Sequence, residues 1–160
     1  MSTVLTSQQR VEAALAAAGV AIEIKTFPVG TRTAADAAAA IGCSVAEIAK
    51  SIVLRAVESD RVVVVVTSGS NRVDERKVAG LLGQAVVRAD ADFVRSKTGF
   101  AIGGVAPVGH LEAPLVLMDR DLQQYGQVWA AGGTGDSVFR ITPSELQTLT
   151  QAPLADIKQE

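Results

Sequence analysis

Apolar residues recur along this chain with two periods, one typical of helices and one typical of strands. In residues 7–19 the apolar positions fall three or four residues apart and end before Gly19, which predicts an amphipathic helix. Similar spacing, or start and stop signals, predict further helices at 31–42, 44–49, 74–83, 89–98 and 142–150. The last of these begins with an N-cap threonine, a proline and a reaching glutamate, which is a strong helix start.

Strand candidates alternate with these helices. Residues 51–57 and 61–67 are rich in β-branched side chains and are joined by a short polar turn, so we expect them to pair antiparallel. The second segment contains a continuous valine run, which predicts burial on both faces. Shorter strands are expected at 21–27, 85–89, 113–119, 127–133 and 137–142.

The order of these elements predicts the fold class. Helices and strands interleave, but several strands follow one another through short turns, which argues against a regular doubly wound fold. We therefore expect an α+β fold in which helices wrap a curved mixed sheet with mostly antiparallel pairing. The length suits a single domain spanning residues 1–160.

Charge and targeting signals narrow the function classes. The formal net charge is −2, unlike that of proteins that coat long nucleic acids. Residues 72–97 nevertheless hold six basic residues against four acidic ones, which fits either a modest basic face or a solvated helix surface. The first ten residues resemble no signal peptide, and no apolar run reaches the ~18 residues of a membrane span. We therefore expect a cytoplasmic protein without a membrane partner.

Common catalytic motifs are missing from the chain. One histidine and one cysteine cannot supply the usual nitrogen and sulfur ligands of a metal site, so we expect no metal and no cofactor. The sequence has no G-x-S-x-G elbow and no phosphate loop of the common ATPase type.

Two features remain as candidates for chemistry. Lys50 stands between apolar residues, where the short helix 44–49 gives way to a strand. Such a lysine either extends to solvent or points into a cleft, where its fixed positive charge stabilises an ester carbonyl, an oxyanion or a phosphate. Residues 98–110, TGFAIGGVAPVGH, either connect two elements or expose the backbone N–H groups of Gly103 and Gly104 to a ligand.

Together these features resemble the YbaK family, the free-standing relatives of the editing domain inserted in bacterial prolyl-tRNA synthetases. The resemblance rests on TRTAADAAAAIGCSVAEIAKSIVL at 31–54, on the valine-rich strand followed by TSG, and on residues 98–110, and it extends from about Val11 to Ile157. It implies the editing-domain fold and hydrolysis of mischarged aminoacyl-tRNA. The tRNA acceptor end would be the ligand, and an aminoacyl-tRNA synthetase is a candidate partner.

The same resemblance implies roles for individual residues. Lys50 corresponds to the lysine that family members need for activity. The Gly-x-x-x-Pro loop from Gly103 to Pro107 would hold the aminoacyl end and the terminal adenosine close to its backbone. Arg32 is a candidate for a phosphate contact, and Asp136 for orienting the ribose or the amino group.

An aminoacyl ester is already activated, so a positioned water, a polarised carbonyl and the ribose hydroxyl of the substrate could suffice for hydrolysis. We expect Lys50 to share a cleft with Gly103 and Gly104, where a side chain at either glycine would fill the space of the ester. Family members act mostly on small amino acids, which implies a substrate of the Ala, Ser or Cys type.

Three alternatives remain open. The chain could be a non-catalytic tRNA- or synthetase-binding module of the same fold, or an unrelated small-molecule enzyme that uses Lys50 as a nucleophile or Schiff base. A DNA-binding regulator has less support, because no helix-turn-helix with basic recognition residues is evident.

Overall fold

The long hairpin expected from the two β-branched runs forms the centre of the fold. The computed structural model describes residues 5–28 and 30–160. In it, β2 (Ile48–Ala56) and β3 (Arg61–Ser68) pair antiparallel along the whole length of β3. Every residue of β3 after Arg61 is buried, which confirms the prediction made from the valine run.

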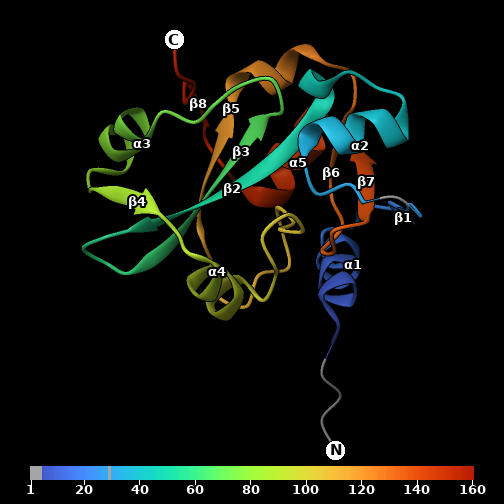
Figure 1. The fold of residues 1–160 in the computed structure, drawn as a ribbon, viewed down its shortest axis with the longest axis horizontal. Helices are drawn as coiled ribbons and strands as arrows, with labels where there is room; N and C mark the ends of the chain where they lie inside the picture. The colour runs from blue at the N-terminus through green and yellow to red at the C-terminus, as the bar shows by residue number, and fades with distance from the viewer. Residues whose placement is uncertain (1–4, 29) are drawn as a thin grey trace, which may run out of the picture.

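An eight-stranded sheet is built around this hairpin, in the order β1-β7-β6-β2-β3-β5-β8, with β4 also paired to β2. Four of the pairings are antiparallel and three are parallel. The remaining strands are β1 (Ile24–Thr26), β4 (Val86–Arg88), β5 (Leu115–Asp119), β6 (Val128–Ala131), β7 (Ser137–Ile141) and β8 (Leu154–Ala155). The predicted α+β fold with a mixed, mostly antiparallel sheet is confirmed (Figure 1).

One edge of β2 is only partly paired. On this edge β6 pairs with Ile48 and Ala49, and β4 pairs with residues 54–56 at the opposite end of the strand. Among the described residues, no strand pairs with residues 50–53 on this edge. The sheet therefore forks here, with β4 and β6 at the two ends of β2 (Figure 1).

Different helices cover the two faces of the sheet. On β3, Val62, Val64 and Val66 face a core shared with α1, α4 and α5, whereas Val63 and Val65 face a smaller core shared with α3. This alternation follows the two-residue period of a strand. A third cluster joins α2 to Ile48 and Trp129. The helices are α1 (Ser7–Ala17), α2 (Ala34–Ile41), α3 (Glu75–Leu82), α4 (Ala91–Thr98) and α5 (Pro143–Thr150).

The helix predicted at 44–49 is only partly correct. The capping box of Ser44 and Glu47 is present, but it opens only the single 3-10 turn η1 (Val45–Glu47). Ile48 and Ala49 already belong to β2, because pairing with β6 and β3 overrides the local helical pattern. Lys50 consequently lies inside a strand and not at a helix end.

Smaller differences concern short elements. The strand expected at 21–27 is limited to Ile24–Thr26. The 3-10 helix η2 (Arg120–Gln124) and strand β8 were not predicted, since each is too short to show a period. None of the helices in the described residues has the length and apolar character needed to cross a membrane.

Candidate functional site

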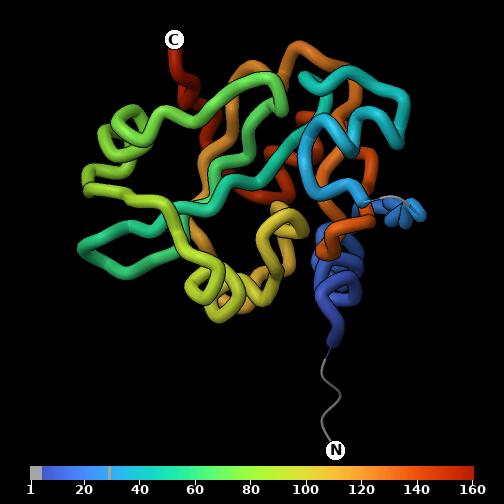
Figure 2. Tube along the Cα trace, in the orientation of Figure 1, coloured from blue at the N-terminus to red at the C-terminus, as the bar shows by residue number. Residues whose placement is uncertain are grey.

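A cleft of about 720 Å³ opens at the fork in the sheet. Five consecutive residues of β2, from Lys50 to Leu54, line it, because here the strand offers its free edge together with side chains from both faces. The other walls come from the segment that enters α2, including Arg32, and from the glycine-rich segment, including Ile102 and Gly103. Figure 2 shows the glycine-rich segment curling back from α4 towards the centre of the molecule.

Lys50 lies in the gap between two helices. Ile48 and Ile52 share its face of β2; Ile48 packs against α2, and Ile52 packs against the cluster that contains α3. Lys50, between these two isoleucines, lines the cleft together with residues of both helices. Among the described residues, Lys50 forms no ion pair. Partial burial, and next the positive charge of Arg72, lower the pKa of the Lys50 ammonium.

Three arginines add to the positive charge of the cleft. Arg32, Arg72 and Arg88 line it together with Lys50, and Glu75 is the single acidic residue that the described chain contributes to the lining. None of these arginines forms an ion pair within residues 5–28 and 30–160. A concave surface with this charge attracts anions.

The glycine-rich segment reaches the cleft through a tight turn. The N–H of Gly104 donates to the carbonyl oxygen of Ala101 at 2.9 Å, which closes a β-turn over residues 101–104. Gly103 has a φ of +90°, whereas Ile102 has a negative φ, so the turn is of type II. Such a turn requires glycine at its third position. The N–H of Gly103 donates to no acceptor among the described residues.

The two adjacent glycines face different neighbours, which corrects the expectation that both would share one cleft with Lys50. A Cβ at Gly103 would lie 3.1 Å from Cβ of Arg32, and a Cβ at Gly104 would lie 2.8 Å from the backbone carbon of Thr134. Gly103 lines the cleft with Lys50, but Gly104 lines an adjoining hollow. Close packing within the protein therefore already accounts for glycine at both positions.

Asp136 lies outside the cleft, in a turn that supports one of its walls. Its carboxylate accepts a hydrogen bond from the hydroxyl of Thr134 at 2.7 Å. The carbonyl oxygen of Gly135 accepts the N–H of Thr31 at 2.8 Å. These contacts hold the segment that carries Arg32 against the turn. Pro107 is buried and also lies outside the cleft lining.

Ser51 is a cleft residue that the sequence interpretation missed. Its Oγ is buried and has no hydrogen-bond partner among the described residues. Buried polar atoms are nearly always paired in proteins, so an unpaired hydroxyl in a cleft is a candidate ligand contact. The available signal was a polar residue beside Lys50 in an otherwise apolar strand.

Helix α1 holds the two ends of the glycine-rich segment together. The guanidinium of Arg10 donates from Nη2 to the carbonyl oxygen of Gly99 at 2.7 Å and from Nε to that of Gly109 at 3.1 Å. The same guanidinium lies 5.0 Å from the centre of the Phe100 ring. The loop between Gly99 and Gly109 is therefore closed at its base by one side chain.

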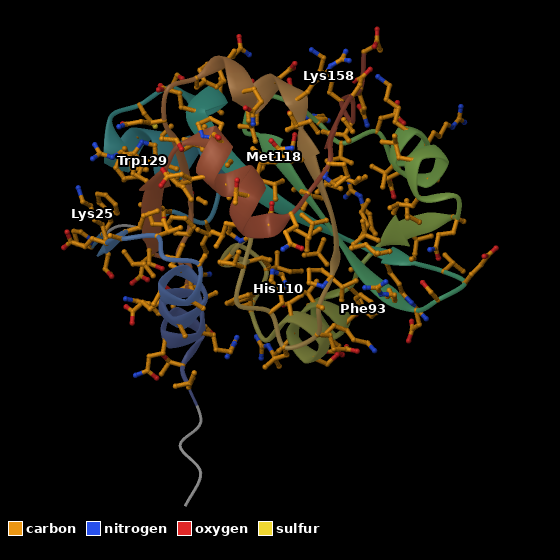
Figure 3. All side chains as sticks on the ribbon, turned by 180° about the vertical axis from the view of Figure 1, so that it is seen from behind. Lys25, Phe93, His110, Met118, Trp129 and Lys158 are labelled. Atoms are coloured by element: carbon orange, nitrogen blue, oxygen red, sulfur yellow. The ribbon has the colours of Figure 1, made fainter. Side chains whose placement is uncertain are left out.

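His110 belongs to this base and not to the cleft lining. In Figure 3 it lies between α1 and α4. Its Nε2 lies 2.7 Å from the carbonyl oxygen of Ala106, and its ring meets that of Phe100 edge-on at 5.1 Å. Burial lowers the pKa of His110, so the neutral ring donates from Nε2 to Ala106.

The described residues contain no group of three or more His, Cys, Asp or Glu side chains that could hold a metal ion.

Sequence comparison matches this chain to a family model and to curated relatives. A family model described as an aminoacyl-tRNA editing domain matches residues 29–149. The uncharacterized protein YwhH of Bacillus subtilis (strain 168) is 33% identical over 124 residues, which cover 78% of this chain and 78% of that protein.

Solved structures share the fold. One, described as a "putative trans-editing enzyme for prolyl tRNA synthetase", is 42% identical with a TM-score of 0.90, and the alignment covers 99% of this chain and 100% of that one. Another, the hypothetical protein APE2540, is 31% identical with a TM-score of 0.87, over 94% of this chain and 99% of that one.

Proposed function

Because this chain belongs to the aminoacyl-tRNA editing domain family, as the resemblance to YbaK proteins predicted, we propose that it hydrolyses mischarged aminoacyl-tRNA in trans. The bond broken is the ester that joins the amino acid to the terminal ribose. The substrates would carry a small amino acid of the Ala, Ser or Cys type.

The observation that carries this proposal is the placement of Lys50. Its ammonium lines the cleft, has no carboxylate partner among the described residues, and lies in the same cleft as the Gly103 turn. When water attacks the ester carbonyl, negative charge develops on the carbonyl oxygen. A preorganised cation stabilises that charge most in the transition state, which accelerates the reaction.

A backbone donor supports the same step. The N–H of Gly103 has no acceptor within the described chain and is available as a second donor to the developing oxyanion. The bond between the carbonyl carbon and the ribose oxygen then breaks, and the departing ribose oxygen takes a proton released by the attacking water. Gly104, Pro107 and Asp136 would act by shaping the walls around these groups.

The apolar part of the cleft suits a small side chain. Ala34, Ala37, Ile102, Val105 and Ala131 contribute to the lining. Such a wall discriminates poorly between amino acids of similar size, since one methylene changes the binding free energy by only about 1–3 kcal/mol. We therefore expect overlapping activity on two or more small aminoacyl groups. Identity elements of the tRNA, or a partner synthetase, would then protect correctly charged products.

A non-catalytic tRNA- or synthetase-binding module of the same fold is the second candidate. The unpaired arginines of the cleft favour tRNA binding under either hypothesis. A measurement of catalytic turnover distinguishes the two hypotheses, because a binding module would protect the ester from hydrolysis whereas a deacylase would cleave it.

The decisive experiment is a deacylation panel. The purified protein is mixed with tRNA charged with Ala, Ser, Cys or Pro, each on a cognate and a non-cognate tRNA, and loss of the ester is followed over time. We expect multiple turnovers on small aminoacyl groups. Lys50→Ala should reduce the rate about 10²–10³-fold while leaving the circular dichroism spectrum unchanged. Equal rates for both proteins would contradict the role of Lys50, and hydrolysis of only a large or charged aminoacyl group would contradict the pocket assignment.

A further inference from the structure

A second hollow adjoins the cleft. It has a volume of about 320 Å³ and lies between α4, the 101–104 turn and residues 133–135. Arg32 and Ile102 line both the cleft and the hollow, so the two spaces meet at these side chains. Ile102 is 61% exposed and stands between them as part of the turn. A ligand in the cleft could therefore continue into the hollow without entering the core.

The side chain of Arg32 is held in a slot between two glycines. A Cβ at Gly103 would lie 3.1 Å from Cβ of Arg32, and a Cβ at Gly135 would lie 2.5 Å from its Nε. Glycine at both positions leaves room for the arginine to lie along the border of the two spaces. The fold positions this guanidinium without an acidic partner among the described residues.

Arg95 supplies a second guanidinium to the hollow. It lies in the last turn of α4, is exposed, and forms no ion pair within the described chain. No acidic residue of that part of the chain lines the hollow. Two uncompensated guanidinium groups around one small concave space favour an anion with several oxygens, because the planar fork of arginine matches phosphate geometry.

We infer that this hollow binds a phosphodiester of the single-stranded 3′ end of tRNA, directly before the terminal aminoacyl-adenosine held in the cleft. The inference rests on the proposed function, since the cleft must hold the aminoacyl end. It adds the hollow as a subsite, with Arg95 as a binding residue. The strand would pass over Ile102, and Arg32 would contact the nucleotides on both sides of it.

Binding of uncharged RNA tests the subsite without any need for hydrolysis. The probe is an RNA hairpin with a single-stranded CCA end, and its affinity is measured by fluorescence anisotropy at several salt concentrations. Arg95→Gln should weaken binding about tenfold, as expected for loss of a charged hydrogen bond, and should reduce the slope of log affinity against log salt by about 0.7. Arg61→Gln is the matched control, since Arg61 is an exposed arginine at the turn end of the β2–β3 hairpin.

A comparison of two ester substrates locates the effect. Alanyl-tRNA contains the phosphodiester, whereas alanyl-adenosine lacks it. Arg95→Gln should raise KM about tenfold on alanyl-tRNA with little change in kcat, and should match the wild type on alanyl-adenosine. Arg95→Lys, which keeps the charge but loses the fork, should retain the salt slope with intermediate affinity.

The outcomes separate the subsite from the proposed function. If the wild type hydrolyses neither ester, the proposed function fails, and the anisotropy measurement still decides whether the hollow binds RNA. If Arg95→Gln binds the hairpin as tightly as Arg61→Gln, or loses equal activity on both esters, the subsite is overturned. The melting temperature of Arg95→Gln should equal that of the wild type, because its side chain forms no hydrogen bond or ion pair within the described residues.

Discussion

Arg10 and Gly99, 89 residues apart in the chain, are joined by a hydrogen bond of 2.7 Å from the Arg10 guanidinium to the Gly99 carbonyl oxygen. Arg10 lies in α1, which precedes the segment matched by the editing-domain family model. The same guanidinium also holds Gly109, so α1 closes the base of the loop that carries the Gly103 turn. The geometry of the cleft thus depends on a helix outside the matched segment.

Removal of this contact should loosen the loop. Arg10→Ala leaves two carbonyl oxygens without their charged donor, which should cost about 1–3 kcal/mol of stability. We expect a lower melting temperature and faster amide hydrogen exchange over residues 99–109. Glu12→Ala is the control, because Glu12 is exposed on the same helix and, within residues 5–28 and 30–160, accepts only one long hydrogen bond, from Gln8. Equal exchange of the loop in both variants would refute the role of Arg10.

Protonation of His110 should destabilise the protein in mild acid. Its folded-state pKa lies below the ordinary value of 6.5, so the unfolded chain binds the proton more tightly. The contribution of the neutral ring to folding stability is fully present above about pH 6.5 and is lost as the pH falls through the folded-state pKa. The melting temperature should therefore drop between pH 7 and pH 5 by more in the wild type than in His110→Gln. Parallel pH curves for the two proteins would contradict this prediction.

Lys50 should oppose folding at neutral pH. Its pKa in the folded protein lies below the ordinary value of 10.5, so the unfolded chain holds the proton more tightly and folding carries a penalty while the group is charged. Lys50→Met keeps the length of the side chain and removes the charge. We expect a melting temperature at pH 7 equal to or above that of the wild type, with a difference that shrinks above pH 10. A clear loss of stability at pH 7 would show that Lys50 makes stabilising contacts instead.

Arg72 should tune the ionisation of Lys50. After burial, its positive charge is the second cause that lowers the pKa of the Lys50 ammonium. Arg72→Gln should raise that pKa, because like-charge repulsion is removed. If cationic Lys50 stabilises the oxyanion, the alkaline decline of kcat moves to higher pH in this variant. The profile is measured after subtraction of spontaneous ester hydrolysis, and an unshifted decline would exclude Lys50 as the titrating group.

Gly103→Ala should reduce stability and activity together. Its φ of +90° strains any side chain, and the added Cβ presses on Arg32 at 3.1 Å. We expect the free energy of unfolding to fall by about 1 kcal/mol and the activity to fall on every aminoacyl group. Gly80→Ala is the opposite control, since Gly80 lies within α3 and a Cβ there would have free space around it. This variant should be more stable than the wild type by about 0.5–1 kcal/mol. Unfolding curves that show no difference between the two variants would contradict the type II turn assignment.

Local pattern was sufficient for much of the fold. The β-branched runs on either side of residues 58–60 predicted the central hairpin, because a valine run with a polar turn is stable only when it is paired and buried. The start signals of α2 and α5 and the glycine that ends α2 were read correctly, since N-caps and C-terminal glycines act within four residues. The order of motifs around Lys50 and Gly103 also predicted the family.

Tertiary structure decided the features that depend on distant segments. Residues 44–49 carry a helix signal, yet long-range pairing with β6 made Ile48 and Ala49 part of a strand. The fork that opens the cleft exists because β6 and β4, which are far apart in sequence, each pair with only one end of β2. The different neighbours of Gly103 and Gly104 depend equally on which loops pack nearby. A periodic pattern reports which face of an element is buried, but the partner that buries it, and the gap left where no partner reaches, follow only from the packing of the whole chain.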